Sequence, residues 1–315
     1  MKHPTKTLVT IGVLLSTQIV NANQINELEL INNKKWLHGA VNCENDKSQA
    51  LDVLKVNETS YILRQNKCLT FEAPFIYVLI GEEKVLVLDT GAIEDEKDMP
   101  LVKAVNDIIA KSTEPSKKQI IVAHSHTHSD HYAGDKLFSG QENVTFVGTT
   151  QKQVNHFFKM NNWPNDISEF DLGNRELSII PTPGHQNQAI TIYDPQTKWL
   201  LTGDSFYPGL IYIREWDEYK QSINRLTEFS KRNKVSALLG SHIEMSNKPT
   251  EVYDIGTTYQ PHEAPLNLSQ KDLVKLNNKL QSISGEEELK FDKFIIQPMN
   301  FMQKSIVNVV SFFNG

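Results

Sequence analysis

The sequence predicts an α/β protein in which strands and helices alternate from Tyr61 onward. Short apolar runs with the length of buried strands recur along the chain, and segments with helical periodicity lie between them. The chain has 315 residues, of which 39% are hydrophobic, and this is enough to build one large core. Its formal net charge of -6 leaves no basic surface, so nucleic acid is not an expected partner.

The N-terminus has the pattern of a secretory signal peptide. Lys2 and Lys6 precede the apolar stretch 8–20, and small residues at 20–22 predict cleavage after Ala22. The apolar stretch is short for a membrane span, so we expect no stable membrane insertion after cleavage. Residues 1–22 are therefore assigned to the signal peptide and the polar residues 23–60 to an N-terminal extension. The mature protein is expected to be periplasmic or secreted.

The chain contains two cysteines, Cys43 and Cys68. In an exported protein such a pair can form a disulfide, but spacing alone does not establish the geometry that the bond needs. Both cysteines lie far in sequence from every candidate metal ligand, so we expect no metal role for them. The sequence leaves open whether they are joined.

The first part of the domain is predicted to be a hairpin followed by a helix. Residues 75–80 and 84–88 are apolar runs separated by a glycine and two glutamates, and the second run leads into Asp89. A helix is expected over about 94–111, because apolar residues form a stripe along it and acids occupy its first turn. The strand 119–123 then delivers the chain to His124.

The later elements follow the same alternation. Apolar stripes predict a helix from Trp216 to Phe229 and another after the capping box that begins at Ser269. In the tail, the apolar segment 301–313 is expected to pack on the body of the protein. Further strands are predicted at 144–147, 177–181, 189–193, 199–202 and 235–239.

A cluster of histidines carries the chemistry. Four of the ten histidines fall within residues 124–131, together with Asp130, directly after a predicted buried strand. Imidazole and carboxylate groups at alternating positions can converge on a cation, and three protein ligands with an open position make a catalytic zinc site. Three more candidates follow other predicted strands: His185, Asp204 and His242.

The run from His126 to His131 resembles the H-x-H-x-D-H signature of the metallo-β-lactamase superfamily. Asp89, His185, Asp204 and His242 stand in the right order for the other motifs of the family. The resemblance extends from about Tyr61 to Met245. It implies an αββα sandwich, with two mixed sheets face to face, helices outside and the metals at one edge. We assign residues 61–285 to this catalytic domain and 286–315 to a C-terminal tail.

The resemblance implies a binuclear site with two Zn²⁺ ions, and iron or manganese can replace zinc in such a ligand set. Asp204 and a hydroxide would bridge the two metals, and Asp89 would orient ligands without coordinating. His124 precedes the signature, so a structural role is expected for it. The first metal would be held by His126, His128 and His185, and the second by Asp130, His131 and His242.

The residue types around the ligands favour an ester or lactone as the small-molecule substrate. Tyr207, three residues after Asp204, resembles the tyrosine of the lactonase branch, which implies that its phenol stabilises the oxyanion. Asp130 or Asp204 would carry the proton. No cysteine lies between His185 and His242, unlike in the cysteine-ligand β-lactamases. The chain is therefore predicted to be a hydrolase of a carboxylic ester, a lactone or a related carbonyl compound.

Three alternatives remain open from the sequence. The histidine-only β-lactamases share the signature, and Asp204-Ser205 is similar to a pair found in some of them, in which case Ser205 would lie near the metals. A glyoxalase-II-like thioesterase is disfavoured because its basic C-terminal motif is not evident. A non-catalytic metal-binding domain is the third.

The walls of the cleft are also predicted from nearness in sequence to the ligands. The segment 242–261 is expected to line the cleft. Four aromatic residues are expected to form an apolar wall with few charges, which would suit an uncharged ester or lactone: Trp163, Phe206, Tyr207 and Trp216. The sequence specifies neither the oligomeric state nor the physiological substrate.

Overall fold

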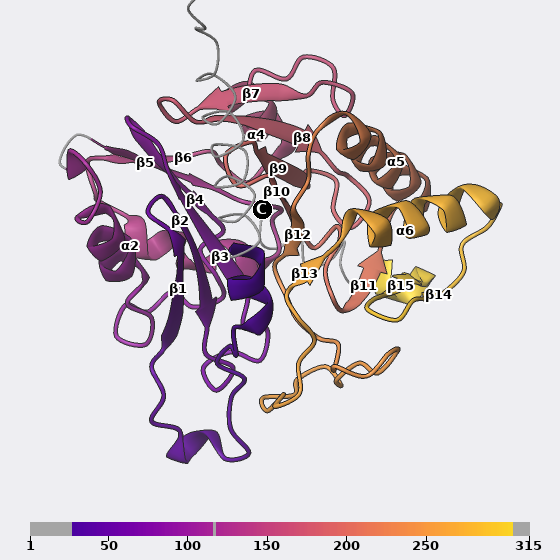
Figure 1. Cartoon of the computed structure of the whole chain (residues 1–315), viewed down its shortest axis with the longest axis horizontal. Helices are drawn as coiled ribbons and strands as arrows, with labels where there is room; N and C mark the ends of the chain where they lie inside the picture. Colours follow the sequence, from indigo (N-terminus) through magenta and orange to yellow (C-terminus); the bar gives the residue numbers. More distant parts are fainter. Residues whose placement is uncertain (1–26, 116–117, 305–315) are drawn as a thin grey trace, which may run out of the picture.

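Two six-stranded sheets lie face to face with helices on their outer faces, as Figure 1 shows. This computed structural model describes residues 27–115 and 118–304. The predicted αββα sandwich is confirmed. The predicted signal peptide lies outside the described residues.

The first sheet combines an antiparallel and a parallel half. Its strand order is β1-β2-β3-β4-β5-β6; neighbours from β1 to β4 pair antiparallel, and β4, β5 and β6 pair in parallel. Side chains on most of β2, β3 and β4 are buried on both faces, as expected for a sheet covered on both sides. The bounds are β1 (Leu51–Asn57), β2 (Ser60–Gln65), β3 (Phe75–Ile80), β4 (Lys84–Leu88), β5 (Gln119–Ala123) and β6 (Val144–Phe146).

The second sheet has the order β13-β12-β10-β9-β8-β7, and within it only β10 and β12 pair in parallel. A smaller third sheet has the order β11-β15-β14. The bounds in the second sheet are β7 (Ser168–Asp171), β8 (Glu176–Pro181), β9 (Ile190–Asp194), β10 (Trp199–Gly203), β12 (Ala237–Gly240) and β13 (Asn267–Leu268). Those in the third are β11 (Leu210–Ile213), β14 (Leu289–Lys290) and β15 (Ile295–Pro298).

The long helices cover the outer faces of the sandwich. Helix α2 (Leu101–Ile109) packs on the first sheet, and α5 (Trp216–Arg232) and α6 (Gln270–Ser282) pack on the second. The capping box predicted at Ser269 is present at the start of α6. The short helices are η1 (Cys43–Asn45), α3 (Ser129–Tyr132), η3 (Ala133–Phe138) and α4 (Gln151–Phe157).

The alternation of side chains along each strand divides the core into three layers. On β5, Ile121 and Ala123 face the opposite sheet, whereas Ile120 and Val122 face α2. On β10, Leu201 faces the first sheet and Leu200 packs toward α5 and α6. Both sheets are therefore buried on both faces, and their loops at one edge stand on a rigid base.

Three sequence predictions need correction or completion. The helix expected from about residue 94 begins at Leu101, because the residue before Pro100 is disfavoured in the helical region. Residues 51–57, assigned to the N-terminal extension, form the edge strand β1. Phe301 and Met302 are exposed, so the expected packing of the tail is wrong for them, and the rest of that segment beyond residue 304 lies outside the described residues.

Cys43 and Cys68 form a disulfide, which answers the question that the sequence left open. The bond ties the loop after β2 to the segment before β1. Within the described residues, no helix is long and apolar enough to cross a membrane.

Candidate metal centre

The predicted ligands lie in loops that follow the carboxyl ends of four strands. The histidine-rich loop follows β5, His185 follows β8, Asp204 follows β10, and His242 comes two residues after β12; Asp89, which is not a predicted ligand, follows β4. In the first sheet β4 and β5 run in the same direction, and in the second sheet β8, β10 and β12 do, so their carboxyl ends gather at one edge of the sandwich. Rigid strands present reactive side chains on such loops.

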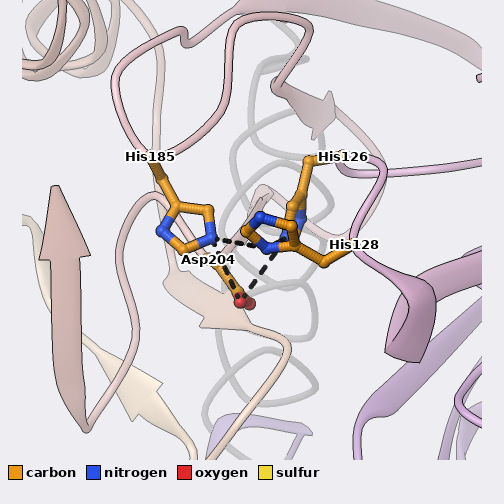
Figure 2. Close-up of side chains that lie close together, drawn as sticks. All are labelled: His126, His128, His185 and Asp204. Atoms are coloured by element: carbon orange, nitrogen blue, oxygen red, sulfur yellow. Dashed lines mark hydrogen bonds and ion pairs between the residues drawn. The ribbon is translucent and has the colours of Figure 1, made fainter. Parts of the chain in front are cut away.

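One ligand group contains three imidazoles and one carboxylate, shown in Figure 2: His126, His128, His185 and Asp204. His128 Nδ1 lies 2.9 Å from His126 Nε2 and 3.1 Å from His185 Nε2. All four ligand atoms lie within 4.8 Å of one another. This is the first predicted ligand set together with the predicted bridging carboxylate.

The second group contains Asp130, His131 and His242. Asp130 Oδ2 lies 3.2 Å from His131 Nε2 and 3.3 Å from His242 Nε2. The two imidazole nitrogens are 3.5 Å apart. Asp130 is therefore positioned beside the imidazoles with which the sequence grouped it.

Asp204 lies between the two groups. Its Oδ2 is 3.6 Å from His126 Nε2 and 3.5 Å from His131 Nε2, one histidine from each group. Its Oδ1 lies 3.5 Å from His242 Nε2. One carboxylate thus faces both ligand groups at once.

Hydrogen bonds on the far side of the rings set which imidazole nitrogen faces the centre. His185 Nδ1 donates to the carbonyl oxygen of Tyr212 at 2.8 Å, and His242 Nδ1 donates to that of Glu72 at 3.0 Å. A neutral imidazole that donates from Nδ1 leaves a lone pair on Nε2. The inward nitrogens are therefore available to a cation.

Asp89 supports the centre from behind, as the sequence predicted. Its carboxylate accepts hydrogen bonds from the Ser125 backbone N–H at 2.7 Å and from the Ser241 hydroxyl at 3.2 Å. It also pairs with His131 Nδ1 at 2.9 Å. His124 points elsewhere, with its Nε2 2.9 Å from Asp135 Oδ1, and it joins neither ligand group.

The side chains fit a divalent cation. Imidazole nitrogens of three histidines face each other at 2.9 and 3.1 Å, and Asp204 Oδ1 is buried without a hydrogen-bond partner among the described residues. Burial, followed by the neighbouring imidazole of His185, lowers the pKa of His128 to about 3, which keeps that ring neutral. A bound cation satisfies all these donor atoms together. The His/Asp site therefore suggests a divalent metal cofactor.

Five of the seven candidate ligands line a pocket with a volume of about 230 Å³ and form its floor: His128, Asp130, His185, Asp204 and His242. Much of the predicted segment 242–261 does line it, through residues of the loop 253–257 and Gln260. Further lining residues come from segments far apart in the sequence: Lys67, Phe71, Glu72, Leu210, Tyr212 and Met299.

The predicted apolar wall is largely wrong. Phe206 and Trp216 are buried against α5 and α6, and Trp163 packs on the core between the sheets, so none of the three lines the pocket. Only Tyr207 does. The wall is also more charged than predicted, because Lys67 and Glu72 belong to it. Nearness in sequence failed as a guide because these three large apolar side chains pack into the neighbouring core clusters and not toward the pocket.

Tyr207 lies at the pocket in a defined hydrogen-bond setting. Its hydroxyl is 3.1 Å from the Leu210 carbonyl oxygen and 3.2 Å from Glu244 Oε2. Burial, and then the charge of Glu244, raise the pKa of Tyr207 well above its ordinary value, so the phenol keeps its proton. Its role as an oxyanion donor stays a prediction.

Ser205, which one alternative placed near the metals, points away from them. Its hydroxyl lies 3.3 Å from the Thr182 carbonyl oxygen and 3.2 Å from the Thr182 hydroxyl. The side chain is buried there and does not line the pocket. The position that the histidine-only β-lactamase alternative implied for Ser205 is therefore not observed, whereas the shared signature on which that alternative also depends is unchanged.

Sequence reasoning missed Lys67, Glu72 and Gln260 as pocket residues. Lys67 adjoins Cys68, and the disulfide was the one sequence feature that could have singled out this loop. Nothing local in the sequence marks Glu72 or Gln260.

Comparisons with known proteins agree with this geometry. The sequence model of the metallo-beta-lactamase superfamily matches residues 69–276. The acyl-coenzyme A thioesterase MBLAC2 of Gallus gallus is 22% identical over 204 residues, which cover 54% of this chain and 72% of that protein. A hydroxyacylglutathione hydrolase of Brucella anthropi is 26% identical over 83 residues, which cover 26% of this chain and 32% of that protein.

Among solved structures, a metallo-beta-lactamase from Pontibacter korlensis is similar in fold. It is 17% identical, has a TM-score of 0.49, and the match covers 74% of this chain and 100% of that one.

Proposed function

The chain belongs to the metallo-β-lactamase superfamily of hydrolases, and from that premise we propose that it is an exported enzyme that uses two zinc ions to cleave a carboxylic ester or lactone. The observation that carries the proposal is the position of Asp204 between two complete ligand groups. A carboxylate shared in this way is what a two-metal site needs.

The donor set favours zinc. Five imidazoles and two carboxylates form the two groups, and zinc prefers imidazole nitrogen with carboxylate oxygen. Iron and manganese accept the same ligands, so the identity of the metal is part of the proposal. We assign the first ion to His126, His128 and His185, the second to Asp130, His131 and His242, and Asp204 to both.

The residues around the metals have different roles in the proposed reaction. When bound, two divalent cations lower the pKa of water and polarise a carbonyl oxygen. Asp130, which is half-buried at the pocket floor, is the group that accepts and passes on the proton at its carboxylate oxygens, with Asp204 as the alternative carrier. The Tyr207 hydroxyl keeps its proton, and it turns from its present acceptors, the Leu210 carbonyl oxygen and Glu244, to donate a hydrogen bond to the substrate carbonyl oxygen as negative charge develops there.

An acyl bond to oxygen or sulfur is the best-supported target. Two similar proteins are named for the hydrolysis of acyl-coenzyme A and of hydroxyacylglutathione, which supports including thioesters in the ester class. The position of Ser205 takes support away from the β-lactam alternative. β-Lactam hydrolysis is therefore not part of the proposal, and the activity test below includes a cephalosporin to detect it.

Export is supported by the pattern of residues 1–22 and by the disulfide between Cys43 and Cys68. Disulfides persist in oxidising compartments and are rare in the cytosol. The test is the N-terminal sequence of the protein recovered from a bacterial periplasm or medium. A start at Asn23 supports cleavage after Ala22, and recovery of the full-length chain in the cytosol contradicts export.

Turnover by the zinc-loaded mature protein tests the activity. An acyl-homoserine lactone, an aryl ester, an acyl thioester and a chromogenic cephalosporin are compared, each with and without a chelator. We expect lactone, ester or thioester turnover that is lost on chelation and in His128→Ala. His156→Ala, at an exposed histidine on α4, is the matched control and keeps its activity. Turnover of the cephalosporin alone contradicts the proposal.

A further inference from the structure

Lys67 is a buried ammonium group in the wall of the metal pocket. The residue is 2% exposed and lines the pocket. Its Nζ donates to the carbonyl oxygen of Phe71 at 2.9 Å, and no carboxylate among residues 27–115 and 118–304 lies within ion-pair distance of it. An ammonium group has three donors. Buried charges in proteins are normally paired, so this one is unusual.

Two of the three acidic residues whose charge acts on Lys67 are bound to other groups. Glu263 binds Arg64 through both carboxylate oxygens, at 2.6 Å each. Glu244 Oε2 accepts the backbone N–H of Leu210 at 2.8 Å. The third, Glu72, lines the same pocket but does not lie within ion-pair distance of Lys67. Lys67 therefore has no direct ion-pair partner within the described part of the chain.

Gln260 supplies a second unsatisfied group in the same wall. The residue is 4% exposed and lines the pocket. Its Oε1 is buried, and among the described residues it has no hydrogen-bond partner. Its backbone N–H donates to the His38 carbonyl oxygen at 2.9 Å, which holds the residue in place. Buried polar atoms are rarely left unpaired, so an unpaired acceptor at a pocket indicates a ligand.

The subsite adjoins the metal floor. Lys67 Nζ is held by the carbonyl of Phe71, and the ligand His242 is held by the next carbonyl, that of Glu72. A substrate with its scissile carbonyl at the metals therefore reaches Lys67 with another group. Lys67 is also the only lysine or arginine among the described residues that line the pocket.

The backbone around Lys67 is well fixed. Cys68 is joined to Cys43, and the Asn66 backbone N–H donates to the Ala50 carbonyl oxygen at 2.9 Å. Asn66 Oδ1 accepts the Cys68 backbone N–H at 2.8 Å. A group held in this way loses little conformational freedom when it binds a ligand.

We propose that Lys67 and Gln260 form a substrate-recognition subsite for a carboxylate, so that the ester or lactone hydrolysed carries a carboxylate on its acyl side. Lys67 donates to the carboxylate, and Gln260 Oε1 accepts from an N–H or O–H group beside it. This inference rests on the proposed function, because it specifies the substrate class of the same pocket.

The kinetic test compares two esters that differ only at the far end of the acyl chain. The 4-nitrophenyl monoester of glutarate carries a carboxylate where 4-nitrophenyl pentanoate carries a methyl group. A charge-assisted hydrogen bond is worth about tenfold to hundredfold in affinity. We expect a preference of that size for the glutarate ester in kcat/KM, expressed mainly in KM, and its loss in Lys67→Met. Lys248→Met, at a lysine whose side chain is 73% exposed, is the matched control and keeps the preference.

Calorimetry gives a readout that does not need turnover. Glutarate and pentanoate are titrated into the zinc-loaded protein, in which one carboxylate of either probe can reach the metals. We expect glutarate to bind about tenfold more tightly or better in the unmodified protein, and the two to bind equally in Lys67→Met. If no ester is hydrolysed but this difference appears, the proposed function fails and the subsite stands.

Two results overturn the subsite. One is equal affinity for glutarate and pentanoate in the unmodified protein, which makes Lys67 a structural residue. The other is a glutarate preference that survives in Lys67→Met. If that variant does not fold, Lys67→Gln keeps a donor for the Phe71 carbonyl without the charge, and the same two outcomes apply to it.

Discussion

The Asp89 carboxylate accepts a hydrogen bond from His131 Nδ1 at 2.9 Å, and both residues are fully buried. In the neutral ring this bond places the proton on Nδ1, and Nε2, which lies 3.2 Å from Asp130 and 3.5 Å from Asp204, then carries the lone pair that a cation would take. Asp89, which is not a candidate ligand, thus determines which ring nitrogen of His131 would bind a metal.

Asp89→Asn tests this relationship. The substitution removes the negative charge that favours an Nδ1-protonated His131, so we expect the second metal to bind about 10- to 100-fold more weakly. Metal affinity is measured by equilibrium dialysis with zinc. Asp135→Asn is the matched control, because Asp135 pairs with His124, which is not a ligand, and it keeps the affinity. Equal affinity in Asp89→Asn and the unmodified protein contradicts the role of Asp89.

The two ligand groups predict different losses of metal. His242→Ala removes a donor from the second group only, so this variant is expected to keep one zinc ion per chain at a zinc concentration that saturates the unmodified protein. Asp204→Ala removes the carboxylate that faces both groups and is expected to weaken both sites. Elemental analysis after dialysis measures the ratio. If the unmodified protein binds only one zinc ion per chain at this saturating zinc concentration, the binuclear assignment is wrong.

Tyr207→Phe tests the oxyanion donor. If the phenol stabilises the developing charge, kcat falls about 100-fold while the zinc content is unchanged. The backbone N–H of Leu210 still binds Glu244 in this variant, so the pocket wall keeps one of its supports. Tyr193→Phe removes a hydroxyl that donates to the Lys234 carbonyl oxygen far from the pocket, and it is expected to leave kcat unchanged. A drop in melting temperature without a drop in kcat would make Tyr207 a structural residue.

The carboxylate preference is expected to depend on pH. Burial, and then the positive charge of Arg64, lower the pKa of Lys67 to about 8, against opposing effects of Glu263, Glu244 and Glu72. Lys67 loses its charge as pH rises through this value. The kcat/KM ratio of glutarate ester to pentanoate ester should therefore be constant below it and fall as pH rises past about 8. Taking the ratio cancels titrations that affect both esters alike, and a ratio independent of pH contradicts the assignment.

Arg175 is expected to be the most sensitive link between the two sheets. It pairs with Asp194 in the second sheet at 2.6 Å and donates to the Thr59 and Ile80 carbonyl oxygens on the side of the first sheet. Arg175→Met leaves the buried Asp194 charge without its partner, which costs about 3–5 kcal/mol of unfolding free energy. Urea denaturation of the zinc-loaded protein measures this. In Arg175→Met combined with Asp194→Asn the loss should be smaller, because no buried charge is left unpaired.

The sequence by itself determined the strands, the order of the motifs and the seven ligand candidates. These features are local: an apolar run predicts a buried strand wherever it packs, and the H-x-H-x-D-H run places its side chains within one loop. The resemblance to one family added the arrangement of the layers. For these reasons the hairpin 75–88 and the strand 119–123 could be predicted with their observed bounds.

Only the tertiary structure decided how the pocket is walled and which residues are joined across the chain. Arg64 and Glu263 are 199 residues apart, and Lys67 and Gln260 line one pocket although they come from the loop after β2 and the loop after β12. The aromatic wall failed as a prediction because Trp163, Phe206 and Trp216 are buried against core residues that come from other parts of the chain. Such contacts arise from strand pairing and burial, which no short stretch of sequence encodes.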